Sequence, residues 1–238
     1  ILNKYNIDVN YLVRLFVDSK DASCMFFDKY GCNLDNLPDL LKNVNKDNFK
    51  GFAFHVGSDN KNINSYLNAI KKTKEAIKIS DNLNLETQII DIGGGLSCEL
   101  SFNDLNELSN MYKKNFYGNY QLIAEPGRFF CEEAFHLVSY IIDKKTNDKN
   151  IYYLDDSIYQ SFNCLHYDHL TYTKCEKGEL SKMYGRTCDG TDIIFDDIFL
   201  PNIDIGTALI FPNMGAYTLS ASSNFNGFHS HKVKVLTN

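Results

Sequence analysis

Short apolar runs alternate with longer amphipathic segments through the first half of the chain. The apolar runs are bounded by polar or glycine-rich turns, which is typical of strands. They predict strands at residues 11–18, 49–58, 87–95 and 121–128. Between them the pattern predicts helices at residues 22–30, 63–80 and 103–114. Strand and helix in strict alternation predict a parallel sheet with crossover helices.

The pattern changes after Arg128. Strand-like segments then follow one another, separated by turn signals such as Lys177-Gly178 and Pro201-Asn202. The predicted strands are residues 132–143, 151–159, 188–200, 205–211 and 232–236. This half is typical of an antiparallel β domain, so we expect two domains, residues 1–130 and 131–238.

Polar residues gather where the predicted parallel strands of the first half end. In a barrel of repeated strand–helix units, chemistry lies at that end of the strands. Four such units do not close a barrel of eight. The first half is therefore either an open sheet or the C-terminal half of a (β/α)8 TIM-type barrel. The opening residues, which lack an initiator methionine, read as the interior of a longer protein and predict that the chain is a fragment.

Composition narrows the classes of function. The 24 basic and 30 acidic side chains give a net charge of −6, which argues against a nucleic-acid partner. No apolar run approaches the roughly 20 residues that a membrane span needs, so we expect no membrane association. The seven cysteines include no Cys-x-x-Cys pair, so we expect free thiols in a reducing, cytoplasmic compartment and no metal site.

Three strand ends carry groups suited to a phosphate. The triplet Gly93–Gly95 follows an apolar strand directly, and glycines let backbone amides approach an anion closely. Ser58 ends a second strand, and Gly127 with Arg128 ends a third. A tight strand–helix turn is the alternative explanation of the glycines. The three ends together predict a phosphate site.

Glu125 and His55, at these strand ends, each allow a structural and a functional interpretation. Glu125 lies between apolar residues and Pro126, so we expect a buried carboxylate that needs a partner. The partner is either an arginine, such as Arg14 or Arg128, or a protonated ring nitrogen. His55 stands alone on an apolar strand, where a hydrogen-bonded core histidine is commoner than a catalytic one.

Several ordered motifs resemble a known family. His-Val-Gly-Ser at residues 55–58, Asp-Ile-Gly-Gly-Gly at 91–95 and Glu-Pro-Gly-Arg at 125–128 resemble the barrel-type pyridoxal-phosphate decarboxylases, which have the alanine racemase-like fold. Later segments resemble the eukaryotic ornithine decarboxylase branch, namely residues 159–163, 167–169, 188–192, 215–218 and 225–228. The resemblance implies decarboxylation of L-ornithine to putrescine, in polyamine biosynthesis, with pyridoxal 5'-phosphate as cofactor.

The resemblance also implies which residues would bind the cofactor. His55 would lie against the pyridine ring, Glu125 would pair with the protonated ring nitrogen, and Arg14 would support the ring side of the site. His55 and Glu125 are thereby candidate catalytic residues. The groups that would hold the cofactor phosphate are Ser58, Gly93, Gly94, Gly95, Gly127, Arg128 and Tyr217.

A second set of residues would serve the substrate. By resemblance, Cys188 would return a proton to the substrate α-carbon after decarboxylation. Asp168 and Asp189 would bind the distal ammonium, and Tyr167 and Phe225 would line the pocket. The family is dimeric, so the resemblance implies a homodimer in which Cys188, Asp189 and Phe225 face the barrel of the partner subunit.

One family feature has no counterpart in the sequence. The lysine that holds the cofactor covalently lies, in the family, in a segment resembling Tyr-Ala-Val-Lys, and no such segment occurs here. Lys20 matches a later, non-catalytic part of the family pattern. We interpret the difference as truncation. Because half a barrel exposes strand edges, we expect the 238-residue polypeptide alone to be insoluble or unfolded.

The residues leave rival functions open. Diaminopimelate, arginine and lysine decarboxylases share the barrel motifs, although Cys188-Asp189-Gly190 favours a simple terminal ammonium. A non-enzymatic relative, similar to the antizyme inhibitors, is the second class. The presence of Cys188, Asp189, Glu125, Arg128 and Tyr217 favours the enzyme. Antizyme and a fused or associated S-adenosylmethionine decarboxylase are further partners that the resemblance suggests.

Overall fold

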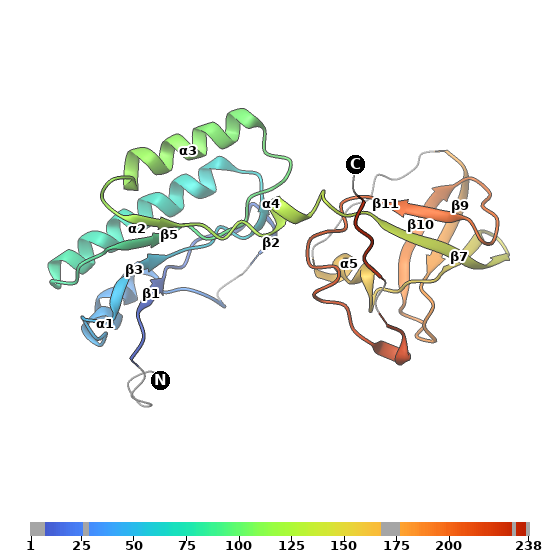
Figure 1. Ribbon diagram of the computed structural model, residues 1–238, viewed down its shortest axis with the longest axis horizontal. Coiled ribbons are helices and arrows are strands. Elements are labelled where there is room, and N and C mark those ends of the chain that lie inside the picture. The colour runs from blue at the N-terminus through green and yellow to red at the C-terminus, as the bar shows by residue number, and fades with distance from the viewer. Residues whose placement is uncertain (1–7, 26–28, 168–176, 230–231, 237–238) are drawn as a thin grey trace. The chain divides into compact units, whose positions relative to one another are not determined.

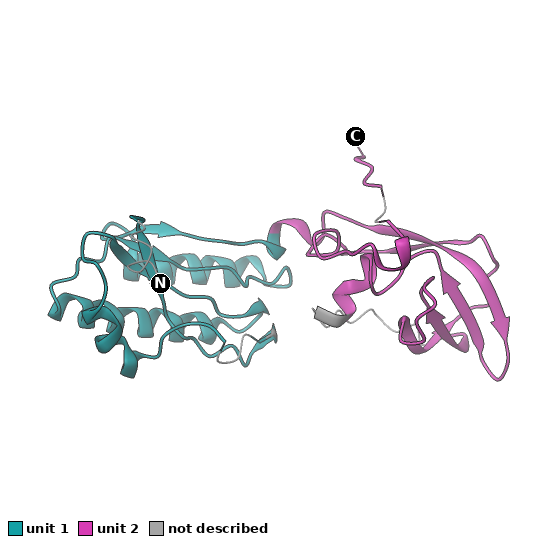
Figure 2. Cartoon of the chain, turned by 90° about the horizontal axis from the view of Figure 1, so that it is seen from below, with its two compact units in different colours: residues 1–129 teal, residues 130–238 magenta. Residues whose placement is uncertain are grey.

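The chain divides into two compact units. The computed structural model describes residues 8–25, 29–167, 177–229 and 232–236. Unit 1 is Ile1–Phe129 and unit 2 is Phe130–Asn238 (Figure 2).

A parallel sheet forms the centre of unit 1 (Figure 1). Its strands are β1 (Tyr11–Arg14), β3 (Phe49–Ala53), β5 (Ile89–Asp91) and β6 (Gln121–Ile123). They lie in the order β1-β3-β5-β6, so each new strand adds to the same side of the sheet. The carboxyl ends of all four strands therefore meet at one edge, which confirms the predicted α/β arrangement of this half.

Helices connect the strands of unit 1. They are α1 (Leu37–Lys42), α2 (Ile63–Asn82) and α3 (Phe102–Phe116), and α4 (Arg128–Cys131) follows the last strand. Two further short strands, β2 (Ala22–Cys24) and β4 (Ser58–Asn60), pair antiparallel, and a 3-10 turn (Leu34–Asn36) precedes α1.

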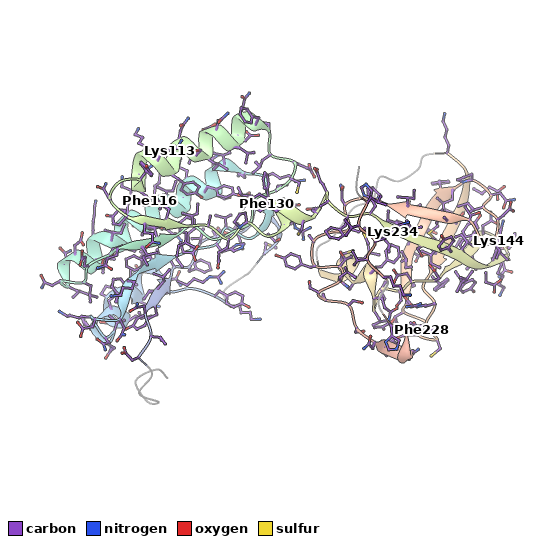
Figure 3. All side chains as sticks on the ribbon, in the orientation of Figure 1. Lys113, Phe116, Phe130, Lys144, Phe228 and Lys234 are labelled. Carbon is purple, nitrogen blue, oxygen red and sulfur yellow. The ribbon has the colours of Figure 1, made fainter. Side chains whose placement is uncertain are left out.

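The long helices α2 and α3 form where apolar residues recur at helical spacing. In α2, Tyr66, Ile70 and Ile77 fall on the buried face, and the Asn62 side chain caps the first turn by accepting the Asn64 amide at 3.0 Å. Phe116, labelled in Figure 3, is fully buried at the end of α3. The predicted helices at 63–80 and 103–114 are confirmed.

A five-stranded sheet forms unit 2, in the order β10-β9-β8-β7-β11. The strands are β7 (Leu137–Thr146), β8 (Asn150–Leu154), β9 (Glu179–Tyr184), β10 (Ile193–Leu200) and β11 (Ala208–Phe211), and the short helical elements are Ser161–Asn163, α5 (Cys164–Tyr167) and Phe225–Gly227. The pairs are antiparallel except β8 and β9, which run parallel. The unit is thus a mixed sheet, which the prediction of a purely antiparallel domain missed.

Several predicted elements are wrong or displaced. Where a helix was expected at residues 22–30, Ala22–Cys24 form the strand β2, because Ala22 and Cys24 pair with the β4 backbone. The strand at residues 49–58 ends at Ala53, and β4 is a separate strand. The strand at residues 121–128 ends at Ile123, and Arg128 begins a helix. Residues 232–236 have no strand, and β9 was not predicted. In the described residues, no helix combines the length and apolar character needed to cross a bilayer.

Candidate functional site

The glycine turn after β5 is held against the neighbouring strand end. The Asp91 carboxylate accepts the Gly93 amide at 2.8 Å, and Gly93 has φ +64°. A Cβ on Gly93 would lie 2.1 Å from the Phe54 carbonyl oxygen, and one on Gly95 would lie 2.1 Å from that of Gly57. Both glycines are therefore required by close backbone approach, whatever ligand binds there.

The middle glycine brings two predicted site residues together. A Cβ on Gly94 would lie 2.5 Å from the Glu125 carbonyl oxygen and 3.2 Å from His55 Nε2. The Glu125 amide also donates to the Gly93 carbonyl at 2.8 Å. The ends of β3, β5 and β6 thus converge on one point, with a histidine on one side and an acidic residue on the other.

A buried arginine lies at the same edge. Arg128 is only 6% exposed, and its Nε donates to Ser58 Oγ at 3.5 Å. The two residues are far apart in the sequence, since Ser58 begins β4 and Arg128 begins α4. Gly57, the neighbour of Ser58, lies against Gly95 of the glycine turn. A positive charge, a hydroxyl and a glycine turn together suit an anion such as phosphate.

The His55 ring is oriented by its own loop. The Gly57 amide donates to His55 Nδ1 at 3.1 Å, so the neutral ring carries its proton on Nε2. Burial, and secondarily the Arg14 guanidinium, lower the pKa of His55 from 6.5 to about 4. Arg14 ends β1 beside β3 and lies 4.7 Å over the Tyr30 ring. A neutral imidazole is the form expected near pH 7.

Glu125 differs from the sequence-based expectation in one respect. Its side chain is exposed, as are those of Ile123 and Ala124, so the prediction of a buried carboxylate is wrong for this chain. In the part of the chain that the structure describes, β6 is the outer strand of its sheet, and Glu125 follows it without a covering element. The apolar residues beside Glu125 in the sequence therefore did not predict its burial correctly.

Unit 2 brings together a second group of predicted residues. Cys188 is exposed, and its Sγ accepts the side-chain amide of Asn226 at 3.1 Å. The Tyr159 hydroxyl donates to the adjacent Asp189 carboxylate at 2.5 Å. This bond, with two from Thr191, lowers the pKa of Asp189 below its ordinary value.

Buried Asp192 fixes the turn that carries Cys188 and Asp189. Asp192 is 1% exposed, and its carboxylate accepts the Ile158 amide at 3.1 Å and the Thr187 hydroxyl at 2.6 Å. These bonds tie residues 187–192 to the segment that follows β8. The turn is therefore fixed by a buried carboxylate, while Cys188 remains exposed to solvent.

Tyr217 also lies in unit 2, in the left-handed backbone region at φ +62°. A Cβ on nearby Gly215 would lie 1.6 Å from the Cys131 carbonyl oxygen, so this segment packs directly on the start of the unit. A non-glycine residue with positive φ is uncommon and indicates a constrained position.

Some predicted residues are not placed. Asp168 lies outside the described residues, and only the backbone of Tyr167 is described, at the end of α5. Tyr159 and Asn226 lie within the family-like motifs, but no sequence pattern assigned them a role. In the structure Tyr159 contacts Asp189, and Asn226 contacts Cys188. Among the described residues no group of histidine, cysteine and acidic side chains could hold a metal ion.

Comparison with known proteins gives consistent matches. Residues 1–132 match the family described as pyridoxal-dependent decarboxylase, pyridoxal binding domain. Ornithine decarboxylase of Caenorhabditis elegans is 33% identical, over 94% of this chain and 60% of that protein. Antizyme inhibitor 2 of Xenopus laevis is 31% identical, over 93% of this chain and 55% of that protein.

A solved structure agrees with this match. The arginine decarboxylase of Paramecium bursaria Chlorella virus, bound to agmatine, has a TM-score of 0.86 and 30% identity, and the match covers 96% of this chain and 66% of that one. The chain spans little more than half the length of the curated relatives that it matches. By the match over more than half of its residues, the chain belongs to the pyridoxal-dependent decarboxylase family.

Proposed function

We propose that this chain supplies most of the cofactor-binding edge and the substrate-binding turn of an ornithine decarboxylase, which converts L-ornithine to putrescine. The observation that carries the proposal is the convergence of His55, Glu125 and the Ser58–Arg128 pair around one glycine turn. Strands added in sequence order support a partial (β/α)8 barrel for unit 1, because an open doubly wound sheet reverses its strand order.

The strand-end residues fit pyridoxal 5'-phosphate. Arg128 and Ser58 would bind the phosphate together with the Gly93–Gly95 turn and Gly127, and Tyr217 would add its hydroxyl. Gly94 packs against the Glu125 backbone carbonyl and lies close to His55, so a side chain there would push the two strand ends apart. By the resemblance, His55 would lie against the cofactor ring and Glu125 would pair with the ring nitrogen.

The proposed chemistry divides between the two units. The bound cofactor would accept the electron pair released when carbon dioxide leaves the substrate. Neutral His55 would contact the ring without adding a positive charge to it, and Glu125 would keep the ring nitrogen protonated. The Cys188 thiol would donate its proton to the α-carbon of the substrate, and the resulting thiolate would take a proton from water.

Asp189 supports a substrate with a distal cation. The lowered pKa of Asp189 keeps it a carboxylate at neutral pH, and with Asp168 it would pair with an ammonium group. A substrate without that charge would leave a carboxylate unpaired, which disfavours its binding. Lysine and arginine also carry distal cations, so ornithine is preferred here on the resemblance and the relatives.

We propose a homodimer with sites shared between subunits, in the cytoplasm. The resemblance supports this arrangement, in which Cys188, Asp189 and Phe225 of one subunit face the strand ends of the other. Cys32 and Cys188 are free thiols, which suits a reducing compartment.

Cofactor binding provides the first test. In the complete protein, Arg128→Gln should weaken pyridoxal phosphate binding by about tenfold to a hundredfold, because a charge-assisted contact to the phosphate is lost. Binding of pyridoxal, which lacks the phosphate, should change little in the same absorbance titration. Equal losses for both compounds would refute the phosphate assignment.

Mixed chains provide the second test. Arg128→Ala and Cys188→Ala variants should each be inactive with ornithine, but mixing the two should restore about a quarter of wild-type activity, since half of randomly assorted dimers have one intact site of two. Mixing Cys188→Ala with Asp189→Ala is the control and should restore nothing, because both changes affect the same half-site. No recovery in the first mixture would exclude the shared site. No release of carbon dioxide by the wild type would favour the regulatory alternative.

A further inference from the structure

Asn226 has an unusual backbone and a specific contact. It lies in the short helical turn Phe225–Gly227 with φ +56° and ψ +20°, in the left-handed region that asparagine tolerates better than most residues. From there its side-chain amide donates to Cys188 Sγ at 3.1 Å. The backbone conformation thus aims the amide at the one cysteine to which the proposed function gives a role.

Tyr159 anchors both partners of this contact. The centroids of the Tyr159 and Phe225 rings lie 4.2 Å apart, and the Tyr159 hydroxyl donates to Asp189, the neighbour of Cys188. The Ser223 amide and hydroxyl both donate to the Tyr159 carbonyl at 2.9 Å, and the Ser223 hydroxyl accepts the Phe225 amide at 3.3 Å. The segment before Asn226 and the turn after Cys188 are therefore fixed to one residue, Tyr159, through its backbone carbonyl and its side chain.

Arg186 holds the other end of the same segment. Its guanidinium lies 4.3 Å over the ring of Phe228, labelled in Figure 3, and donates to the His229 carbonyl at 3.1 Å. Arg186 is two residues before Cys188. The segments 186–189 and 225–229 are therefore held together on both sides of the Asn226–Cys188 contact. A contact fixed at both ends has a defined geometry even though both side chains are exposed.

We propose that Asn226 is a positioning residue for Cys188, which holds the sulfur in one orientation and stabilises the thiolate that remains after the proton is transferred. The inference rests on the proposed role of Cys188 as proton donor. A proton donor has to present its proton at a fixed point, and an N–H that donates to the sulfur fixes its orientation and offers a hydrogen bond to the negative charge left on it. The sulfur loses a proton to the α-carbon and regains one from water, and Asn226 is unchanged.

Glycine is the informative substitution at position 226. Asn226→Gly removes the amide but accepts the left-handed backbone without strain, so the fold should be retained. Alkylation of Cys188 by iodoacetamide at pH 7, followed peptide by peptide by mass spectrometry without cofactor or substrate, should slow about fivefold, the loss expected for one hydrogen bond to a thiolate. Asn226→Asp, which places an anionic oxygen at the sulfur, should slow it further.

Two controls separate positioning from loosening. Asn224→Gly changes the same residue type in the same segment, where no side-chain bond to Cys188 occurs, and should leave the alkylation rate unchanged. Buried Cys164 reports any opening of unit 2 and should stay unreactive in every variant. Equal rates for Asn226→Gly and Asn224→Gly would overturn the proposal, as would faster alkylation of Cys188 and Cys164 together.

Steady-state kinetics of the complete holoenzyme give an independent readout. Asn226→Gly should lower kcat and leave KM for ornithine unchanged, because the substrate ammonium is bound by other groups. A change in KM alone would contradict a role at Cys188. If the wild type decarboxylates no amino acid, the proposed function fails, whereas the alkylation experiment still decides whether Asn226 acts on the thiol.

Discussion

Glycine 95 shows how tightly the strand ends are packed at the residue scale. It has φ +96°, and a Cβ there would lie 2.1 Å from the Gly57 carbonyl oxygen, a backbone atom that cannot move away alone. We expect Gly95→Ala to lower the free energy of unfolding by roughly 2–4 kcal/mol, from backbone strain and the clash together.

Gly118→Ala is the matched control for this prediction. Gly118 has a similar φ of +86°, but a Cβ would meet nothing within 4 Å. It should therefore cost only the strain of the left-handed backbone, about 1 kcal/mol. Urea unfolding of both variants of the complete protein measures the difference, and equal losses would mean that the contact with Gly57 is unimportant.

His55 should remain neutral well below neutral pH. Its folded pKa of about 4 lies below the ordinary 6.5, because burial and then Arg14 disfavour the charged ring. Between these values the unfolded chain binds a proton that the folded chain does not, so the unfolding free energy falls as pH falls through this window.

An NMR titration of the His55 ring in the cofactor-free protein measures this pKa directly. We expect a midpoint well below 6, and a higher midpoint in Arg14→Gln, because the second cause of the shift is removed. A wild-type midpoint near 6.5 would show that the ring is better solvated than its burial indicates.

At the scale of elements, a helix that depends on local signals was predicted, whereas a strand that depends on tertiary pairing was not. The helix α3 begins at a reciprocal cap in which the Ser101 side chain accepts the Asp104 amide and Asp104 accepts the Ser101 amide. Such signals are local, and the helix was predicted within a few residues. The segment from Ala22 formed a strand instead of a helix because its partner β4 lies some 35 residues away, beyond the reach of any local pattern.

Removing the cap tests the stability of α3. Ser101→Ala should lower the free energy of unfolding by about 1 kcal/mol, because the Asp104 amide in the first turn loses the side-chain oxygen that accepts it. Ser109→Ala, an exposed serine in the middle of the same helix, is the control and should be neutral or slightly stabilising. Thermal unfolding of both variants would contradict the prediction if Ser109→Ala were the more harmful change.

At the scale of the whole molecule, the described residues form a four-stranded sheet and the two-stranded β2–β4 pair in unit 1, and a five-stranded sheet in unit 2. In the described residues, β1 and β6 are the outer strands of the unit 1 sheet. A groove of about 840 Å³ follows β1, lined by residues that include Leu12, Val13 and Val44. β1 pairs with β3 on one side, and among the described residues no strand pairs along its other side. An outer strand of this kind is a template for association with other chains.

We therefore expect a polypeptide of residues 1–238, expressed alone, to be insoluble or to associate. The complete protein expressed in parallel is the control. Sedimentation and thermal melting measure the outcome, and soluble, monomeric material with a cooperative transition would contradict the prediction.

The family, the alternation of strands and helices in unit 1, and the residue types available at each strand end could all be predicted from local pattern. These depend on local pattern and ordered motifs such as Asp-Ile-Gly-Gly-Gly, which the family match confirmed. The sequence did not predict that Glu125 is exposed, because burial depends on what covers a strand and not on its neighbours in sequence.

Which polar groups meet depends on the tertiary fold. The Ser58–Arg128 pair and the Tyr159–Asp189 and Asn226–Cys188 contacts join residues at least 30 positions apart. No local pattern encodes such distances, since they result from the pairing of strands and the packing of two separate cores. The glycine turn is the clearest case, because its sequence suggested a phosphate site while its structure shows that neighbouring backbone alone already requires each glycine.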